Sequence, residues 1–70
     1  MRVLVIGANG KVGKHIVDKL VETEHTPYAM VRKKDQIPQF EEKGVETIHG
    51  DLMRDFEHAF KGMDSVIFAA

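Results

Sequence analysis

A glycine-rich turn between an apolar run and a helical pattern constrains this chain more than any other feature. Residues 2–6 read Arg-Val-Leu-Val-Ile, and such near-continuous apolarity is typical of a strand buried on both faces. Residues 7–13 follow as Gly-Ala-Asn-Gly-Lys-Val-Gly. From residue 11 the apolar side chains recur at helical spacing, so the segment predicts a strand, a tight glycine turn and a helix in that order.

The helix after the turn is predicted to bury one face. The apolar side chains assigned to that face are Val12, Ile16, Val17, Leu20 and Val21. A polar stretch at 23–26 should end this unit. Pro27 can open the next segment because a first strand position needs no backbone N–H in the ladder. A second strand is therefore predicted at residues 28–31.

Two more helices and two more strands follow. Asp35 is a candidate N-cap for a short helix that reaches Lys43 and stops at Gly44, with Pro38 in its first turn. A third strand is expected at 45–49 and a fourth at 65–69. The third helix is expected between them, starting near Asp51 or Asp55 and ending near Gly62, with these side chains on one face: Phe56, Ala59, Phe60 and Met63.

The alternation of strands and helices predicts an α/β fold with a Rossmann-type parallel sheet. Right-handed crossovers in a βαβαβαβ chain give the strand order 3-2-1-4. Seventy residues are about half of a usual domain, so residues 1–70 are expected to be the N-terminal part of one Rossmann-type domain. In such a fragment the apolar residues 66–68 would lack half of their cover at the sheet edge.

Each glycine of the turn has a separate physical reason. Gly7 allows a sharp exit from the strand, Gly10 leaves room for a pyrophosphate, and Gly13 lets the helix pack closely on the sheet. Backbone N–H groups at the helix start then face an anionic ligand. The turn residues predicted to bind a dinucleotide are Gly7, Asn9, Gly10, Lys11, Val12 and Gly13.

Two other interpretations of the turn stay open. It could be a structural glycine turn that binds nothing. It could also be a P-loop, which requires G-x-x-x-x-G-K-[ST], but Ala8 stands at the first glycine of that pattern and His15 at the Mg²⁺-binding hydroxyl. The strand before, the helix after and a second strand about 20 residues on favour the dinucleotide interpretation.

The end of the second strand decides which dinucleotide is expected. NAD binding uses an acidic residue there to bind the ribose 2′-OH. This chain has Arg32 and Lys33, two cations suited to a 2′-phosphate, so NADP is favoured over NAD. The alternative is that Arg32, Lys33 and Lys34 form a solvated charged turn.

With these residues the chain resembles the N-terminal part of the atypical and extended short-chain dehydrogenase/reductase families, whose members include sugar-epimerase-like proteins. Besides the glycine turn and Arg32, the resemblance rests on Asp51-Leu52 and on Phe68-Ala69-Ala70. It implies that Asp51 bonds the adenine amino group, Leu52 packs on the adenine ring, and Ala69 lies along the ribose and nicotinamide. Asp51 could instead cap the third helix, and Ala69 and Ala70 could be small core residues.

Related enzymes usually carry a Tyr-x-x-x-Lys pair, whose lysine lowers the tyrosine pKa for acid/base work. The only tyrosine here is Tyr28, four residues before Arg32 on a predicted strand, so this stretch contains no catalytic pair. The resemblance implies an oxidoreductase or epimerase that acts on a small-molecule substrate. The alternatives are a non-catalytic NADP(H)-responsive regulator and a fragment without function of its own.

Composition excludes other partners. A net charge of -1 removes the electrostatic argument for nucleic acid, and no apolar run approaches the ~20 residues of a membrane helix. With no cysteine and only scattered histidines, no metal site is expected, and a reducing, cytoplasmic compartment is predicted.

Overall fold

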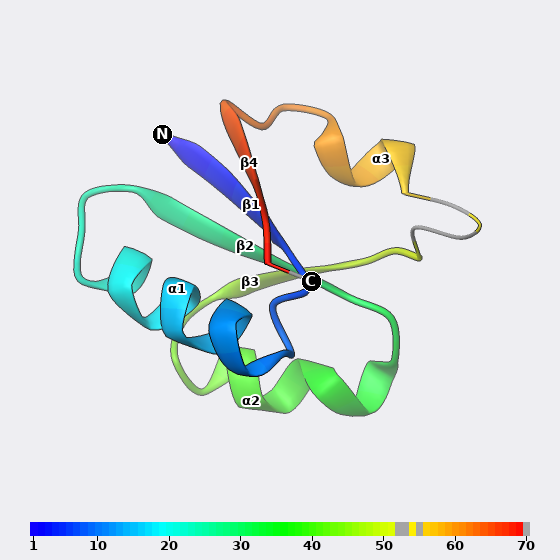
Figure 1. Ribbon diagram of the computed structural model, residues 1–70, viewed down its shortest axis with the longest axis horizontal. Coiled ribbons are helices and arrows are strands. Elements are labelled where there is room, and N and C mark those ends of the chain that lie inside the picture. The colour runs from blue at the N-terminus through cyan, green and yellow to red at the C-terminus, as the bar shows by residue number, and fades with distance from the viewer. Residues whose placement is uncertain (52–53, 55, 70) are drawn as a thin grey trace.

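A computed structural model of the chain describes residues 1–51, 54 and 56–69. Strands and helices alternate along it (Figure 1). In chain order they are β1 (Arg2–Ile6), α1 (Lys11–Val21), β2 (Thr26–Val31), the 3₁₀ helix η1 (Lys34–Gln36), α2 (Ile37–Glu41), β3 (Glu46–His49), α3 (Glu57–Phe60) and β4 (Ser65–Phe68). The four-stranded sheet is parallel in the order β3-β2-β1-β4, which confirms the predicted fold class.

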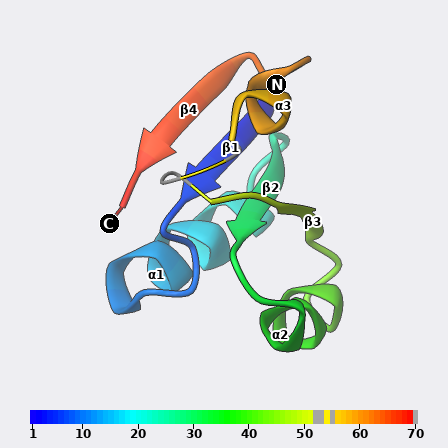
Figure 2. The same cartoon turned by 90° about the vertical axis from the view of Figure 1, so that its right-hand side faces the viewer.

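Helices lie on both faces of the sheet. α1 and α2 cover one face and α3 lies on the other, as the two views show (Figures 1 and 2). β1 is central, and its Leu4 is in register with Tyr28 of β2 and with Val66 of β4. Because β1 is covered on both faces, Val3, Leu4, Val5 and Ile6 are all buried, as the continuous apolar run predicted.

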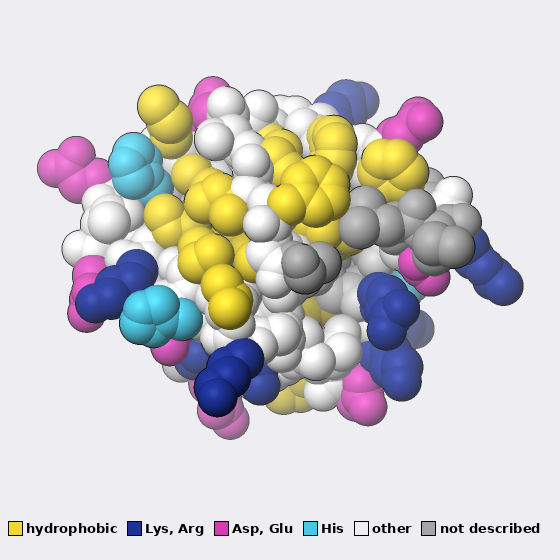
Figure 3. All heavy atoms as spheres, in the orientation of Figure 1, with side chains coloured by type: hydrophobic (Ala, Val, Ile, Leu, Met, Phe, Trp, Pro, Cys, Tyr) yellow, Lys and Arg dark blue, Asp and Glu magenta, His cyan; other side chains and the backbone are white. Residues whose placement is uncertain are grey.

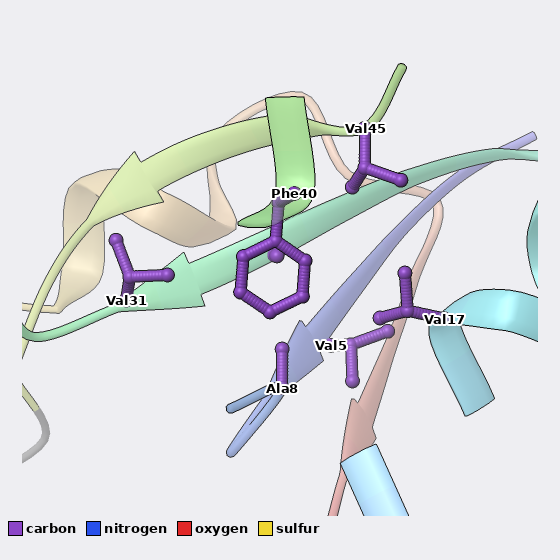
Figure 4. Close-up of a cluster of buried hydrophobic side chains, with 7 residues drawn as sticks. Val5, Ala8, Val17, Val31, Phe40 and Val45 are labelled. Atoms are coloured by element: carbon purple, nitrogen blue, oxygen red, sulfur yellow. The ribbon is translucent and has the colours of Figure 1, made fainter. Parts of the chain in front are cut away.

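The main core lies between the sheet and the helices α1 and α2. Phe40 of α2 is fully buried and extends toward β1 and the glycine turn, where it packs in one cluster with Val5, Val17 and Ala8 (Figure 4). A fully buried apolar side chain of this size contributes about 1.5–3 kcal/mol. Ala8, the residue after Gly7, is therefore a core residue, which explains why a small apolar side chain stands there.

The opposite face of the sheet is less completely covered. Leu4, Ile6 and Met30 pack there against Ala59 of α3. At the outer edge, Phe68 of β4 keeps 64% of its surface exposed, in line with the partial cover expected for this strand. Hydrophobic side chains gather on the face shown in Figure 3, over β4 and α1.

The prediction that Val12 and Val21 lie on the buried face of α1 was wrong. Val12 is 62% exposed and Val21 44%, whereas Gly13 and Val17 form the buried contact with the sheet. At about 100° per residue, Val12 lies roughly 140° around the helix from Val17. The predicted apolar face therefore covered a larger part of the helix circumference than the part that contacts the sheet.

The predicted N-cap at Asp35 was also wrong. Asp35 lies inside η1, and Lys33 is the residue that precedes this short helix. α2 then runs only to Glu41, and Gly44 closes the segment with a φ of 75°, as expected of a helix-terminating glycine. Val45 is buried but lies before β3, because its N–H donates to the Phe40 carbonyl and not to a neighbouring strand.

The third helix is shorter than predicted. α3 has four residues, and Met63 lies beyond its end. The rings of Phe56 and Phe60 meet edge to face, with centroids 5.7 Å apart. Ala59 is buried but Phe60 is partly exposed, so only part of the predicted apolar face reaches the sheet.

Candidate functional site

The sequence-predicted site residues follow the carboxyl ends of the strands, at one edge of the sheet. Two backbone hydrogen bonds continue the ladder past these ends: Gly50 N–H donates to the Val31 carbonyl at 3.0 Å, and Ala69 N–H donates to the Ile6 carbonyl at 2.8 Å. The segments that begin at Gly7, Arg32, Asp51 and Ala69 therefore start side by side. Leu52 lies outside the described residues.

Two glycines of the turn are required by the fold itself. Gly7 leaves β1 with a φ of 81°, a conformation that L side chains rarely adopt. Gly13 lies so close to the preceding backbone that a Cβ atom would stand 2.1 Å from the Gly7 carbonyl oxygen. The structure thus gives these two glycines the geometrical roles that the sequence predicted.

Gly10 differs from both. Its φ of -75° and ψ of 166° suit any residue, and a Cβ atom would meet only the Gly7 carbonyl oxygen, at 3.3 Å. The Gly7 carbonyl would have to move by a few tenths of an ångström to accommodate that contact. Gly10 is exposed, so neither backbone strain nor packing explains the missing side chain. The open backbone surface suits the close approach of a ligand.

The start of α1 suits an anion. Gly10 is the N-cap and makes no side-chain cap, and the first turn contains no acidic residue. The first N–H groups of a helix have no partner within it, and the helix dipole favours negative charge there. Lys11 and Val12 are exposed at this position. Val12 therefore remains a candidate site residue although it is not a core residue.

Asn9 of the turn is joined to α2. The side-chain amide of Gln39 donates a hydrogen bond to Asn9 Oδ1, across 30 positions of sequence. Asn9 is half-buried and Gly10 N–H donates to the Gly7 carbonyl at 3.0 Å, so the turn is held from inside and from α2. No sequence pattern pointed to Gln39.

The end of β2 carries the two predicted cations. Arg32 and Lys33 are exposed, and Lys and Arg side chains gather on the flank where the chain passes from β2 to α2 (Figure 3). Between the described residues the structure has one ion pair, Lys43 with Asp18, at 2.7 Å. The positive charge at the end of β2 is thus not neutralised by a described carboxylate.

Gln36 holds the backbone of this dibasic segment. Its Oε1 atom accepts hydrogen bonds from Arg32 N–H at 3.1 Å and from Lys33 N–H at 3.2 Å. Sequence reasoning missed this residue because it assigned the helix start to Asp35. A signal was present, since Gln36 stands three positions after Lys33, where a capping-box glutamine reaches back to the N-cap N–H.

The remaining candidates lie at the ends of β3 and β4. Asp51 is half-buried, and its carbonyl accepts the Arg54 N–H. The alternative of Asp51 as the N-cap of α3 does not hold, because Phe56 occupies that position without a side-chain cap. Ala69 packs against the main core cluster, so the interpretation of it as a small core residue holds.

The comparison with known families shows to which family this chain belongs. A family model described as NAD(P)H-binding matches residues 7–70, from the first glycine of the turn to the end of the chain. The chain belongs to this family. Its ligand class is therefore a nicotinamide dinucleotide, and the predicted resemblance to short-chain dehydrogenase/reductase and epimerase-like proteins is confirmed.

Members related to this chain include epimerase-like proteins and reductases. "Uncharacterized sugar epimerase YhfK" of Bacillus subtilis (strain 168) is 38% identical over 74 residues, which cover all of this chain and 35% of that protein. "Phenylcoumaran benzylic ether reductase Betv6" of Betula pendula is 34% identical over 79 residues, covering 94% of this chain and 25% of the reductase.

Solved structures agree on the fold. A protein of Bacillus halodurans assigned as an NAD-dependent epimerase/dehydratase superposes with a TM-score of 0.93 at 46% identity, covering all of this chain and 33% of that one. The chain thus spans about a third or less of the length of these family members. Among the described residues, no helix is both long and apolar enough to cross a membrane.

Proposed function

We propose that residues 1–70 are the N-terminal, NADP(H)-binding part of one Rossmann domain in an oxidoreductase or epimerase. The observation that carries the choice of NADP is the pair of exposed cations, Arg32 and Lys33, where an NAD-binding protein has a carboxylate. A guanidinium binds a phosphate through two parallel hydrogen bonds and an ammonium adds a point charge. Both would act on the 2′-phosphate of the adenosine ribose.

The glycine turn fits the pyrophosphate of the same ligand. Gly10 is exposed and has a backbone conformation open to any residue, so its bare surface supports close approach of a phosphate. N–H groups at the start of α1 would donate to the phosphate oxygens. The turn residues assigned to this role are Gly7, Asn9, Gly10, Lys11, Val12 and Gly13.

The adenine and nicotinamide ends of the dinucleotide are assigned to residues that follow β3 and β4. Asp51 at the end of β3 would bond the adenine amino group, and Leu52 would pack on the adenine ring. Ala69 follows β4, whose backbone would lie along the ribose and nicotinamide. When bound, the nicotinamide supplies or accepts a hydride, and the residues of this chain bind and orient it.

A thermal melt followed by circular dichroism tests the proposal on the chain as it is. A ligand that binds only the folded state at 100 times its Kd stabilises it by about 2.7 kcal/mol, which for a domain of this size raises Tm by roughly 10–20 °C. We expect NADPH to raise Tm more than NADH at equal concentration and matched salt, with ATP as a control for general polyphosphate binding.

Each outcome of this melt bears on one part of the proposal. Equal shifts by NADPH and NADH would contradict the assignment of Arg32 and Lys33 to a 2′-phosphate. A shift by ATP as large as that by NADPH would indicate a general phosphate site. A melt that neither dinucleotide changes would contradict the assignment of residues 1–70 as a binding unit.

A further inference from the structure

The segment after β2 is held by side chains that come from outside it. Gln36 Oε1 accepts the N–H groups of Arg32 and Lys33, at 3.1 and 3.2 Å. Gln36 N–H donates in turn to the Lys33 carbonyl at 3.0 Å. One glutamine therefore fixes the backbone of both cationic residues.

A second contact comes from β3. The ring Nε2–H of His49 donates to the Arg32 carbonyl at 2.9 Å. His49 lies directly across from Val31 in the β2–β3 register, so its side chain reaches the first residue beyond the end of β2. The carbonyl of His49 itself accepts the ring Nε2–H of His58 at 2.6 Å. Both polar groups of the Arg32 backbone thus have partners, one from Gln36 and one from His49.

The cationic side chains are directed outward from this fixed backbone. Arg32 and Lys33 are exposed, whereas Gln36 is half-buried. No carboxylate among the described residues forms an ion pair with either one. A long flexible cation loses rotamer freedom when it binds a ligand, so a backbone already held in place lowers the total ordering cost.

We propose that Gln36 is a positioning residue that sets the preference for NADP(H) over NAD(H), assisted by His49. This inference rests on the proposed function, because it takes the 2′-phosphate as the ligand of Arg32 and Lys33. Gln36 does not touch the phosphate. By accepting the two N–H groups, it fixes the backbone from which the guanidinium and the ammonium extend.

Gln39 provides an internal comparison. It lies three positions after Gln36 on the same short segment, but its side chain bonds Asn9 of the glycine turn and not the dibasic segment. Because the pyrophosphate is common to both dinucleotides, loss of the Gln39 contact should affect them equally. Gln36 and Gln39 thus support two segments that are assigned to different parts of one ligand.

The experiment compares Gln36→Met with Gln39→Met in residues 1–70. Methionine keeps the length of the side chain and removes the amide. Dissociation constants for NADPH and NADH are measured by titration calorimetry at one salt concentration, and melts without ligand report folding. We expect Gln36→Met to weaken NADPH binding about 5-fold with NADH unchanged, as for loss of one hydrogen-bonded support. Gln39→Met should change both constants by the same factor.

A third variant distinguishes a positioning role from a folding defect. His49→Phe keeps the ring and removes the donor to the Arg32 carbonyl, and it should shift the ratio of the two constants in the same direction as Gln36→Met. A purely structural role would lower Tm and leave the ratio unchanged.

The outcomes separate this inference from the proposed function. If the unmodified chain prefers NADPH and both Gln36→Met and His49→Phe keep that preference, the positioning role is overturned and the 2′-phosphate site stands. If the unmodified chain shows no preference or binds neither dinucleotide, the proposed NADP site and the positioning role are both overturned.

Discussion

The glycine turn and the dibasic segment follow neighbouring strands at the same edge of the sheet, and they are built in opposite ways. The turn after β1 exposes backbone because side chains are missing, with Gly7 at a positive φ and Gly13 against the backbone of Gly7. The segment after β2 exposes the side chains of Arg32 and Lys33, and its backbone is held by Gln36.

Because of this difference, we expect the two regions to contribute differently to folding and to ligand binding. The glycine turn is part of the packing of α1 on the sheet, so changes at Gly7, Ala8 and Gly13 are changes to the fold. The dibasic segment presents exposed charges, and substitutions there leave the core intact. Binding of a pyrophosphate and choice between two dinucleotides are thus expected to respond to different mutations.

The largest effect is expected from Gly13→Ala, which tests the turn as part of the fold. A Cβ atom would stand 2.1 Å from the Gly7 carbonyl oxygen and 2.7 Å from Ala8 Cα, both backbone atoms. We expect the free energy of unfolding, measured in urea, to fall by about 3 kcal/mol. His15→Ala, at an exposed position of α1, should change it by no more than about 0.5 kcal/mol. A loss at Gly13 as small as that control would show that α1 can move away from the turn.

The next effect is expected from Gly10→Val, which separates binding from folding within the same turn. The backbone conformation of Gly10 suits valine, and the one close contact of the new Cβ is at 3.3 Å. The variant should fold, whereas both NADPH and NADH should bind at least ~100-fold more weakly, a loss of about 2.7 kcal/mol. Melts without ligand serve as the folding control. Unchanged affinity in the folded variant would remove Gly10 from the phosphate site.

The smallest of the three effects is expected from Arg32→Asp, which sharpens the contrast between the two regions. Loss of a charge-assisted hydrogen bond predicts NADPH binding weaker by roughly 10- to 30-fold, with NADH unchanged or improved. Lys34→Asp makes the same change of charge inside η1 and is the matched control, with a smaller expected effect on both. Equal losses of NADPH and NADH affinity in Arg32→Asp would contradict a 2′-phosphate contact.

Local sequence patterns predicted the parts of this molecule that depend on near neighbours. The buried apolar run at 2–6 and the structural roles of Gly7 and Gly13 depend on residues a few positions away, so they follow from local backbone conformation and side-chain size. The strand order also followed, because parallel strands with short helical connections allow few arrangements. The family match agrees with these features.

Contacts between distant segments decided the rest. Val12 has the same apolar character as Val17, but only the docking of α1 through Gly13 determines which of them faces the sheet. Asp35 is a better N-cap by residue type, yet η1 begins after Lys33 and α2 after Gln36, whose side chain accepts the N–H groups of Arg32 and Lys33. Secondary-structure propensity depends on a residue and its near neighbours in sequence. Tertiary packing determines which apolar side chain is buried and where each helix begins.

The sequence by itself determined that a glycine-rich turn follows the first strand and that positive charge follows the second, because both properties reside in the residues concerned. Only the tertiary structure decided how these two regions are held. Gln39 and His49 act across 30 and 17 positions of sequence, and these contacts exist only because the parallel sheet and α2 bring those segments together.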